Sequence, residues 1–371
     1  MLRKIQNSFI ILSTTILFYV NSIRIPEGVS EYPTAPIWSN YLADPFAFQS
    51  NGMYYMIGTA PISVKDNFTF PALVSNDSAT WKYASHILHI TKQAGQPDAY
   101  WAPEIAEKDN IYYLFYSAGF DDKKHRLRVA TSTSPLGPYE DDDAIELTDV
   151  SKLPFAIDPH PFRDQQDGQW YLFYSQDFLD TDDGYRVGTG IVVDRLLDNM
   201  TRLAGNKTVV LRAKHDWQLF EANRSIYDHI YDWYTLEGAA VWQQEPNVYV
   251  CFYSGSNWKT PTYGVDYGIA ESPMGPYSED STDHPRITRS VNGSIIGPGH
   301  NSIIRGADNL TTYIVYHGWN EARTIRSPYI SKLTWKTQIP INSSSGQDVL
   351  HLALVFLGFV IFILLIFHHA L

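Results

Sequence analysis

The sequence predicts an all-β protein, and more specifically a five-bladed β-propeller that forms a single domain. The main observation is a motif that occurs five times, in which an ionisable residue is followed by a short polar turn and an aromatic-rich strand. Each copy is typical of a β-hairpin, because Asn, Asp, Gln and Gly favour the turn while Tyr, Phe, Val and Ile favour the strands. The ionisable residues that open the five copies are Asp44, Glu104, Asp158, Glu237 and His300.

A second repeat adds a third strand to each hairpin. Residues 128–139 end in Ser-Pro-Leu-Gly-Pro-Tyr, residues 268–277 end in Ser-Pro-Met-Gly-Pro-Tyr, and residues 188–193 are a weaker counterpart. Each unit therefore has three or four antiparallel strands, and the units recur about 55 to 80 residues apart, as propeller blades do. Because no segment has the pattern of a long amphipathic helix, we expect the propeller to span residues 23–340.

The composition fits a protein with a large folded core. Of the 371 residues, 14% are aromatic and only 18% are charged, which excludes a disordered chain. The formal net charge of -12 argues against nucleic acid and against an anionic membrane surface as partners, because both bind a basic face.

Both ends of the chain have the pattern of processing signals. Residues 1–22 combine Arg3 and Lys4 with an apolar run and small residues, which predicts a secretory signal peptide. Residues 341–371 contain a Ser-rich spacer and an apolar tail long enough to span a bilayer. A glycosylphosphatidylinositol (GPI) attachment signal is favoured because no Lys or Arg follows the tail, and a single transmembrane helix is the alternative.

Asparagine usage indicates a chain in the secretory pathway, whereas cysteine usage gives no information on the compartment. Cys251 is the only cysteine, so no disulfide framework is expected, and its place in an apolar strand predicts a buried thiol. Eight Asn-x-Ser/Thr sequons indicate a glycosylated surface. They begin at Asn67, Asn76, Asn199, Asn206, Asn223, Asn292, Asn309 and Asn342.

The propeller fold predicts that the five ionisable residues converge. The innermost strand of each blade lines the central axis, so the residues that open these strands point at the mouth of one funnel. Turn chemistry alone explains one or two acids at strand starts, but clustered carboxylates repel one another and destabilise a fold unless they are used. Hydrolysis of a glycosidic bond needs two such groups, a protonated acid and an ionised base, and a third carboxylate can raise the pKa of the acid.

The same motifs carry a resemblance to a known family. The segments LADPF, WAPEI, AIDPHPF, LEGAAV and GPGHNSI, in this order, resemble the five blade motifs of glycoside hydrolase family 43, and the likeness covers the whole predicted domain. It implies a five-bladed propeller that cleaves arabinose- or xylose-containing saccharides with inversion. It also implies that Asp44 is the general base, Asp158 the residue that tunes the pKa of the acid, and Glu237 the general acid. His300 matches the axial histidine, which in several members lies beside a water-coordinated calcium.

Further residues are matched to the family less directly. Phe46 and Trp101 are expected to stack on sugar, with core packing as the alternative for both. Arg326 matches the late arginine of the family, and Arg323 is the alternative. The other expectations are an architectural place for Glu104, a strand-end hydrogen bond for His160, and a rim loop formed by the insert at residues 213–234, from Ala213 to Tyr234.

The resulting hypothesis is an inverting glycosidase at the outer cell surface, an α-L-arabinofuranosidase or β-xylosidase. An endo-acting arabinanase and a non-catalytic carbohydrate-binding propeller are the alternatives. No cofactor is required by this chemistry, although a structural calcium is expected at the axis with His300 contacting it through water. The expected partner is a carbohydrate substrate, the expected oligomeric state is a monomer, and contact with a membrane is expected only through the C-terminal tail or its lipid anchor.

Overall fold

The computed structural model describes residues 22–338 except 64, 92–93, 150, 153, 281 and 292–294. Contacts divide the chain into two units, and the sheets belong to the unit formed by Ile25–Lys336. The predicted anchor, and all but the last residue of the predicted signal peptide, lie outside the described residues. In the part of the chain that is described, no helix is long and apolar enough to cross a membrane.

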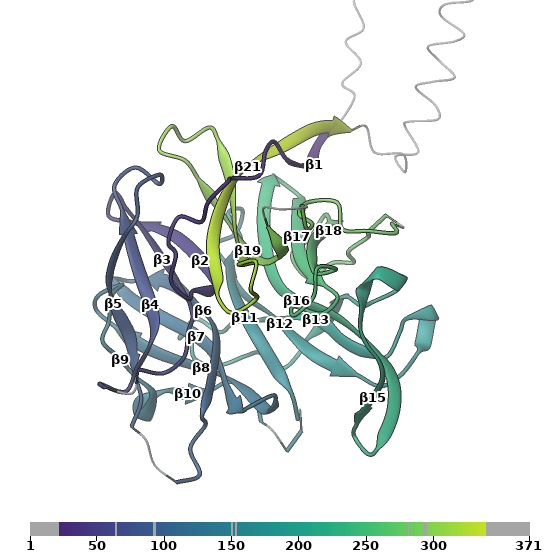
Figure 1. Ribbon diagram of the computed structural model, residues 1–371, viewed down its shortest axis with the longest axis horizontal. Coiled ribbons are helices and arrows are strands. Elements are labelled where there is room, and N and C mark those ends of the chain that lie inside the picture. The colour runs from purple at the N-terminus through teal and green to yellow at the C-terminus, as the bar shows by residue number, and fades with distance from the viewer. Residues whose placement is uncertain are drawn as a thin grey trace, which may run out of the picture. The chain divides into compact units, whose positions relative to one another are not determined.

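The described strands form five blades in chain order, as the sequence predicts (Figure 1). The first blade contains β2 Ala43–Ser50, β3 Met53–Thr59, β4 Phe68–Ser75, β5 Lys82–His89 and the short β9 Tyr139–Glu140. The second contains β6 Ala99–Lys108, β7 Ile111–Phe120, β8 Lys123–Ser132 and β10 Ile145–Glu146. The third contains β11 Ala156–Arg163, β12 Trp170–Phe178, β13 Gly188–Arg195 and β14 Thr208–Leu211.

The last two blades complete the ring. The fourth contains β16 His229–Glu245, β17 Val248–Gly255 and β18 Gly264–Ala270, and β15 Leu219–Ile226 pairs with the beginning of β16. The fifth contains β19 Ile296–Arg305, β20 Thr312–Trp319, β21 Arg326–Gln338 and the N-terminal strand β1 Ile23–Val29. The innermost strands contact one another in the cycle β2, β6, β11, β16, β19 and back to β2, so the ring is closed.

Apolar packing holds neighbouring blades together. The buried hydrophobic residues fall into five clusters, one for each pair of neighbouring blades. Representative pairs, from the first interface to the last, are Ile87 with Leu114, Phe115 with Leu172, Phe173 with Tyr253, Phe252 with Tyr316, and Val315 with Met56. Because successive side chains of a strand point to opposite faces, these clusters bury both faces of every blade. Cys251 is buried in one of these interfaces, as predicted.

Each innermost strand is interrupted by a bulge at the residue that faces the axis. The register shifts lie within Ala43–Phe46, Trp101–Glu104, Ile157–His160, Glu237–Ala240 and Gly299–Ser302. The residues with left-handed backbone at these shifts are Asp44, Ala102, Asp158, Gly238 and His300, with φ between 47° and 61°. A bulge turns its residue out of the pleat, and at Asp44, Asp158 and His300 it directs the side chain into the axial cavity.

This register corrects the expectation that an ionisable group occupies the same position in all five copies. The residues equivalent to Asp44 are Ala102 in the second blade and Gly238 in the fourth, so Glu104 lies two residues after the bulge and Glu237 one residue before it. The sequence motif aligned the acids by type, whereas the backbone aligns the residues that the bulge places in the left-handed region.

The insert before the fourth blade is a hairpin rather than the predicted loop. It contains a 3₁₀ turn, η3 Asp216–Gln218, then β15 and the beginning of β16, joined at Tyr227 and Asp228. Figure 1 shows this hairpin standing out at the lower right. Its turn is fixed by a hydrogen bond of 2.6 Å from the Tyr227 hydroxyl to Asp177, at the end of β12. The other two helical turns are η1 Asp141–Asp143 and η2 Asp182–Gly184.

Candidate active site

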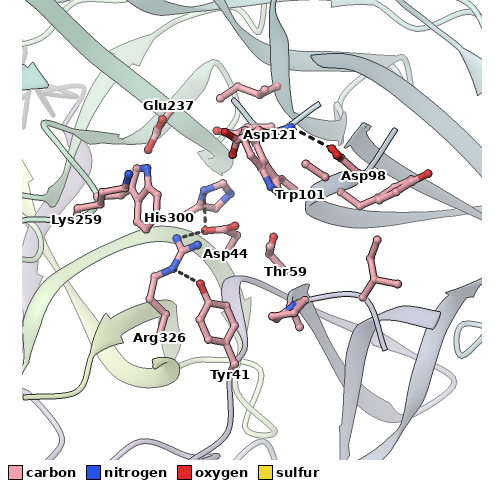
Figure 2. Close-up of a pocket in the computed structure, with 18 residues that line it drawn as sticks. Tyr41, Asp44, Thr59, Asp98, Trp101, Asp121, Glu237, Lys259, His300 and Arg326 are labelled. Carbon is pink, nitrogen blue, oxygen red and sulfur yellow. Dashed lines mark hydrogen bonds and ion pairs between the residues drawn. The ribbon is translucent and has the colours of Figure 1, made fainter. Parts of the chain in front are cut away.

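A cavity of about 410 Å³ opens at the axial ends of the innermost strands, and its size is typical of a small-ligand pocket. Figure 2 shows the lining residues, which come from all five blades. The structure brings together there six of the seven residues that the sequence singled out for the site. They are Asp44, Trp101, Asp158, Glu237, His300 and Arg326.

Asp44 lies among three nitrogen-bearing side chains. Its Oδ1 atom is 3.3 Å from Nη1 of Arg326, 3.5 Å from Nδ1 of His300 and 3.3 Å from Nδ1 of His317. Burial alone would raise the pKa of Asp44, but the Arg326 guanidinium holds it well below its usual range. Asp44 is therefore ionised at neutral pH.

The hydrogen bond at His317 decides which of its nitrogens carries the proton. The backbone N–H of Asp44 donates to Nδ1 of His317 at 3.1 Å. Nδ1 is therefore the unprotonated nitrogen of the neutral ring, and the ring proton lies on Nε2. Burial lowers the pKa of His317 to about 4, and burial also lowers the pKa of His300. Both imidazoles are neutral near pH 7, which leaves Arg326 as the cation that balances Asp44.

Three of the other bulges are held in the same way, by a side chain that accepts the backbone N–H of the bulge residue. Ala102 N–H donates to Thr59, Asp158 N–H to Ser117, and His300 N–H to Ser254, always to a side chain at the end of a second strand in the preceding blade. The equivalent residue for the fourth blade is Ser175, whose hydroxyl has no partner in the described structure.

In the fourth blade the acceptor of the bulge N–H is Asp158, a catalytic candidate, instead of that serine. The N–H of Gly238 donates to Oδ2 of Asp158 at 3.0 Å. Glycine is favoured at this bulge, because a Cβ atom on residue 238 would lie only 3.1 Å from ring atoms of His300. Asp158 is thereby bonded to the residue that follows Glu237, which ties the two acids together.

The two acids titrate as a pair. Burial raises the pKa of Asp158 well above its usual value, and the carboxylates of Glu237 and Asp44 raise it further. Burial also raises the pKa of Glu237, to about 7, with Asp44 adding to the rise and a hydrogen bond from Tyr263 opposing it. One cavity therefore holds an ionised carboxylate at Asp44 and a protonated carboxyl on Glu237 at mildly acidic pH, which is the division of labour that acid–base catalysis needs.

The two predicted aromatic contacts have different places. Trp101 lines the cavity, and one face of its ring stacks on buried His125 with 3.7 Å between centroids. Phe46 is not among the residues that line the cavity. Its ring stacks on Phe48 at 5.7 Å and packs against the core between the first two blades, because the bulge at Asp44 turns the following residues back into the sheet. Phe46 therefore has the core-packing place that the sequence left open as its alternative.

Glu104 and His160 have architectural places, as expected. Oε2 of Glu104 is 2.7 Å from Nδ1 of His160, and Nε2 of that ring accepts the N–H of Val241 at 2.9 Å. The pair thus joins the innermost strands of the second, third and fourth blades. Arg323, the alternative to Arg326, lies in the exposed turn before β21.

The donor set at the axis does not fit a directly bound calcium ion. Calcium prefers six to eight oxygen ligands, whereas His300 offers nitrogen. Among the described residues, no three His, Cys, Asp or Glu side chains gather in a metal-binding arrangement. Contact with calcium through water stays a prediction, and no catalytic step depends on it here.

Several lining residues could not be found from the motifs. Tyr41 receives a hydrogen bond of 3.1 Å from Nε of Arg326, and Trp258 lies under the same guanidinium at 4.4 Å. Asp98 and Asp121 lie on one side of the cavity and Lys259 on the other (Figure 2). These residues belong to loops outside the repeated motif, and no periodicity marks them.

Comparison with known proteins agrees with this geometry. Residues 33–339 match the family model of glycosyl hydrolases family 43. A β-D-galactofuranosidase from Aspergillus niger is 28% identical over 76% of this chain and 75% of that protein. An extracellular endo-α-(1→5)-L-arabinanase from Bacillus subtilis is 23% identical over 81% of this chain and 87% of that protein.

Solved structures show the same fold. The crystal structure of a thermostable family-43 glycoside hydrolase matches with a TM-score of 0.67 and 26% identity, covering 85% of this chain and 97% of the other. An endo-1,4-β-xylanase from Bacteroides thetaiotaomicron matches with a TM-score of 0.63 at 23% identity, over 83% of this chain and 99% of that one. From its family model, its fold and the acids gathered at its axis, this chain belongs to glycosyl hydrolases family 43 and is a glycosidase.

Proposed function

We propose that this glycosidase acts with inversion of configuration, with Asp44 as general base, Glu237 as general acid and Asp158 as the residue that tunes the acid. The observation that carries the proposal is the opposite protonation of two buried carboxyl groups in one cavity. Arg326 holds the pKa of Asp44 well below its usual range, whereas burial raises the pKa of Glu237 to about 7. A module that only bound sugar would have no need for this difference.

In the proposed reaction, the sugar to be released occupies the cavity between the two groups. The Asp44 carboxylate takes a proton from a water molecule as that water attacks the anomeric carbon. The Glu237 carboxyl gives its proton to the glycosidic oxygen as the bond to the leaving group breaks. The products are a free sugar of inverted configuration and an alcohol, after which Glu237 regains a proton and Asp44 loses one to solvent.

For the substrate, we propose terminal α-L-arabinofuranosyl or β-D-xylosyl units of plant-type saccharides. The names of the relatives support pentose- and furanose-containing substrates, including galactofuranosides. The test is a panel of nitrophenyl α-L-arabinofuranoside, β-D-xyloside and β-D-galactofuranoside with the purified ectodomain, residues 23–340. Proton NMR of the first product would show its anomeric configuration, and retention would contradict the proposed inversion.

Endo action on arabinan is the second candidate, because arabinanases are among the relatives. Linear arabinan distinguishes the two modes. Release of monosaccharide from the outset indicates exo action, whereas a ladder of oligosaccharides with a rapid fall in viscosity indicates endo action.

For the location, we propose the outer cell surface, with attachment through a GPI anchor at the C-terminal end. Three of the relatives are named as extracellular enzymes. Five of the described sequon asparagines are exposed, as glycosylation requires. They are Asn76, Asn199, Asn206, Asn223 and Asn309.

A further inference from the structure

Tyr263 contacts the proposed general acid directly. Its hydroxyl lies 2.8 Å from Oε1 of Glu237, and the side chain is almost fully buried. Tyr263 is the last residue of the loop between β17 and β18, a segment that the repeated motif does not include. Burial and the neighbouring carboxylates raise the pKa of Tyr263 well above its usual value, so the hydroxyl keeps its proton and remains a donor.

The ring of Tyr263 has no room to leave this position. One face stacks nearly parallel on His317, with 5.9 Å between centroids and 13° between planes. On another side lies Gly299, where any Cβ atom would overlap ring atoms of Tyr263. His317 in turn accepts the N–H of Asp44. The contacts that fix the tyrosine therefore belong to the same network that fixes the base.

The loop is also held from outside the cavity by the insert. Ser256 donates to the carbonyl of Leu219 at 3.1 Å, and the side-chain amide of Asn257 donates to the carbonyl of Phe220 at 3.0 Å. Both acceptors lie at the start of β15. The hairpin that distinguishes the fourth blade thus supports the loop that carries Tyr263.

We propose that Tyr263 is the positioning residue that determines which oxygen of Glu237 carries the catalytic proton, an inference that rests on the proposed role of Glu237 as the acid. A protonated carboxyl has one carbonyl oxygen and one hydroxyl. Because Oε1 accepts the tyrosine proton, Oε1 is the carbonyl oxygen and Oε2 carries the proton. After Oε2 has given that proton to the leaving group, the same hydrogen bond stabilises the carboxylate that remains.

Other charged groups around Glu237 do not replace this contact. Asp44 and Asp158 carry like charge when ionised, and Arg326 acts on Glu237 through space while it pairs with Asp44. His300 lies against Gly238 and is neutral near pH 7. Among the described residues, Tyr263 is the one whose side chain donates a hydrogen bond to Glu237.

The test is Tyr263→Phe, which keeps the ring and its stacking but removes the donor. We expect kcat/KM to fall about 10- to 100-fold for alkyl glycosides, the range expected for one hydrogen bond to a developing charge, and to fall less for nitrophenyl glycosides. Because the hydrogen bond lowers the pKa of Glu237, its loss should also move the alkaline limb of the pH profile to higher pH.

The matched control is Tyr316→Phe. Tyr316 is equally buried and its hydroxyl is 2.9 Å from Oγ of Ser331, outside the cavity, so this variant loses one buried hydroxyl contact without touching the acids. An equal loss on both leaving groups in Tyr263→Phe, with the alkaline limb unmoved, would overturn the proposal.

A second readout does not need activity. The pKa of Glu237 can be followed by ¹³C NMR of protein labelled at the glutamate side-chain carboxyl, with Glu237→Gln to assign the signal. A higher pKa in Tyr263→Phe than in the wild type supports the proposal, and an unchanged pKa overturns it. If the wild type hydrolysed no glycoside, the proposed function would fail while this titration still decided the role of the hydrogen bond.

Discussion

Nη1 of Arg326 lies 3.3 Å from Oδ1 of Asp44, and both side chains are buried at the axis of the propeller. Residues 282 positions apart in the chain meet here because β2 and β21 belong to the neighbouring first and fifth blades. Since His317 and His300 are neutral near pH 7, the guanidinium is what keeps the proposed base ionised. Asp44 and Glu237 thus differ in protonation because Arg326 forms its ion pair with Asp44.

The first prediction removes that cation. In Arg326→Met, the pKa of Asp44 rises because burial is no longer opposed by a positive charge. The base must be ionised to work, so the acidic limb of kcat/KM should move to higher pH, and Arg326→Lys should restore part of the shift. Arg305→Met is the control, because Arg305 is exposed and lies over Trp242. An acidic limb that is the same in Arg326→Met and in the wild type would contradict this role.

The second prediction concerns the leaving group. Glu237→Gln removes the donated proton, so alkyl glycosides should lose about 10²–10⁴-fold in kcat/KM, while nitrophenyl glycosides retain more activity because their leaving group needs little protonation. Glu279→Gln is a close control, since burial also raises the pKa of Glu279 to about 7 and Tyr253 donates to it, but it does not line the cavity. Equal losses on both substrates would remove Glu237 from the role of acid.

The repeats were enough to predict the architecture. Polar turns, aromatic-rich strands and five copies of one motif predicted the number of blades, and the structure has the five closed interfaces that follow from it. The motif did not predict which residue of each copy occupies the bulge. Asp44 and Glu237 both open an aromatic hairpin in the sequence, yet only Asp44 occupies the bulge, since the residue with the left-handed backbone in the fourth blade is Gly238.

Contacts between loops could not be predicted, because they depend on which loops meet above the axis. Tyr263 follows no periodic pattern. It lies in the loop after β17, whereas its partner Glu237 lies on β16. The sequence shows a glycine at position 299 but not why glycine is needed there. The structure shows that the ring of Tyr263 leaves no room for a Cβ atom. For Phe46 the sequence left sugar stacking and core packing open, and its contact with Phe48, which decides between them, appears only in three dimensions.

The third prediction concerns stability rather than catalysis. His160→Leu leaves the Glu104 carboxyl and the N–H of Val241 buried without their partner, and should lower the free energy of unfolding by about 2–4 kcal/mol. Urea unfolding followed by tryptophan fluorescence measures this. His284→Leu, at an exposed histidine, should stay within about 0.5 kcal/mol of the wild type. Equal stability of the two variants would show that the bridge between blades contributes little.

The fourth prediction tests the attachment of the enzyme. If residues 341–371 are a GPI signal, phosphatidylinositol-specific phospholipase C should release active enzyme from intact cells. Truncation after residue 340 should give the same activity in the medium without the phospholipase. Release by detergent alone would instead indicate a transmembrane helix.

The fifth prediction separates the two coupled acids. Because burial raises the pKa of Glu237 to about 7, the wild-type alkaline limb of kcat/KM should lie near that pH. Asp158→Asn removes a neighbouring carboxylate but keeps an oxygen that can accept the Gly238 N–H, so the backbone of the fourth blade is held as before. In the states of the pair in which Asp158 is ionised, its charge opposes ionisation of Glu237, so without that carboxyl Glu237 should lose its proton more easily and the alkaline limb should move to lower pH. Asp177→Asn is the control, since burial raises the pKa of Asp177 to about 6 at a site outside the cavity. A limb that stays in place in Asp158→Asn would mean that Asp158 is neutral in the active enzyme, and its assignment as the residue that tunes the acid would be wrong.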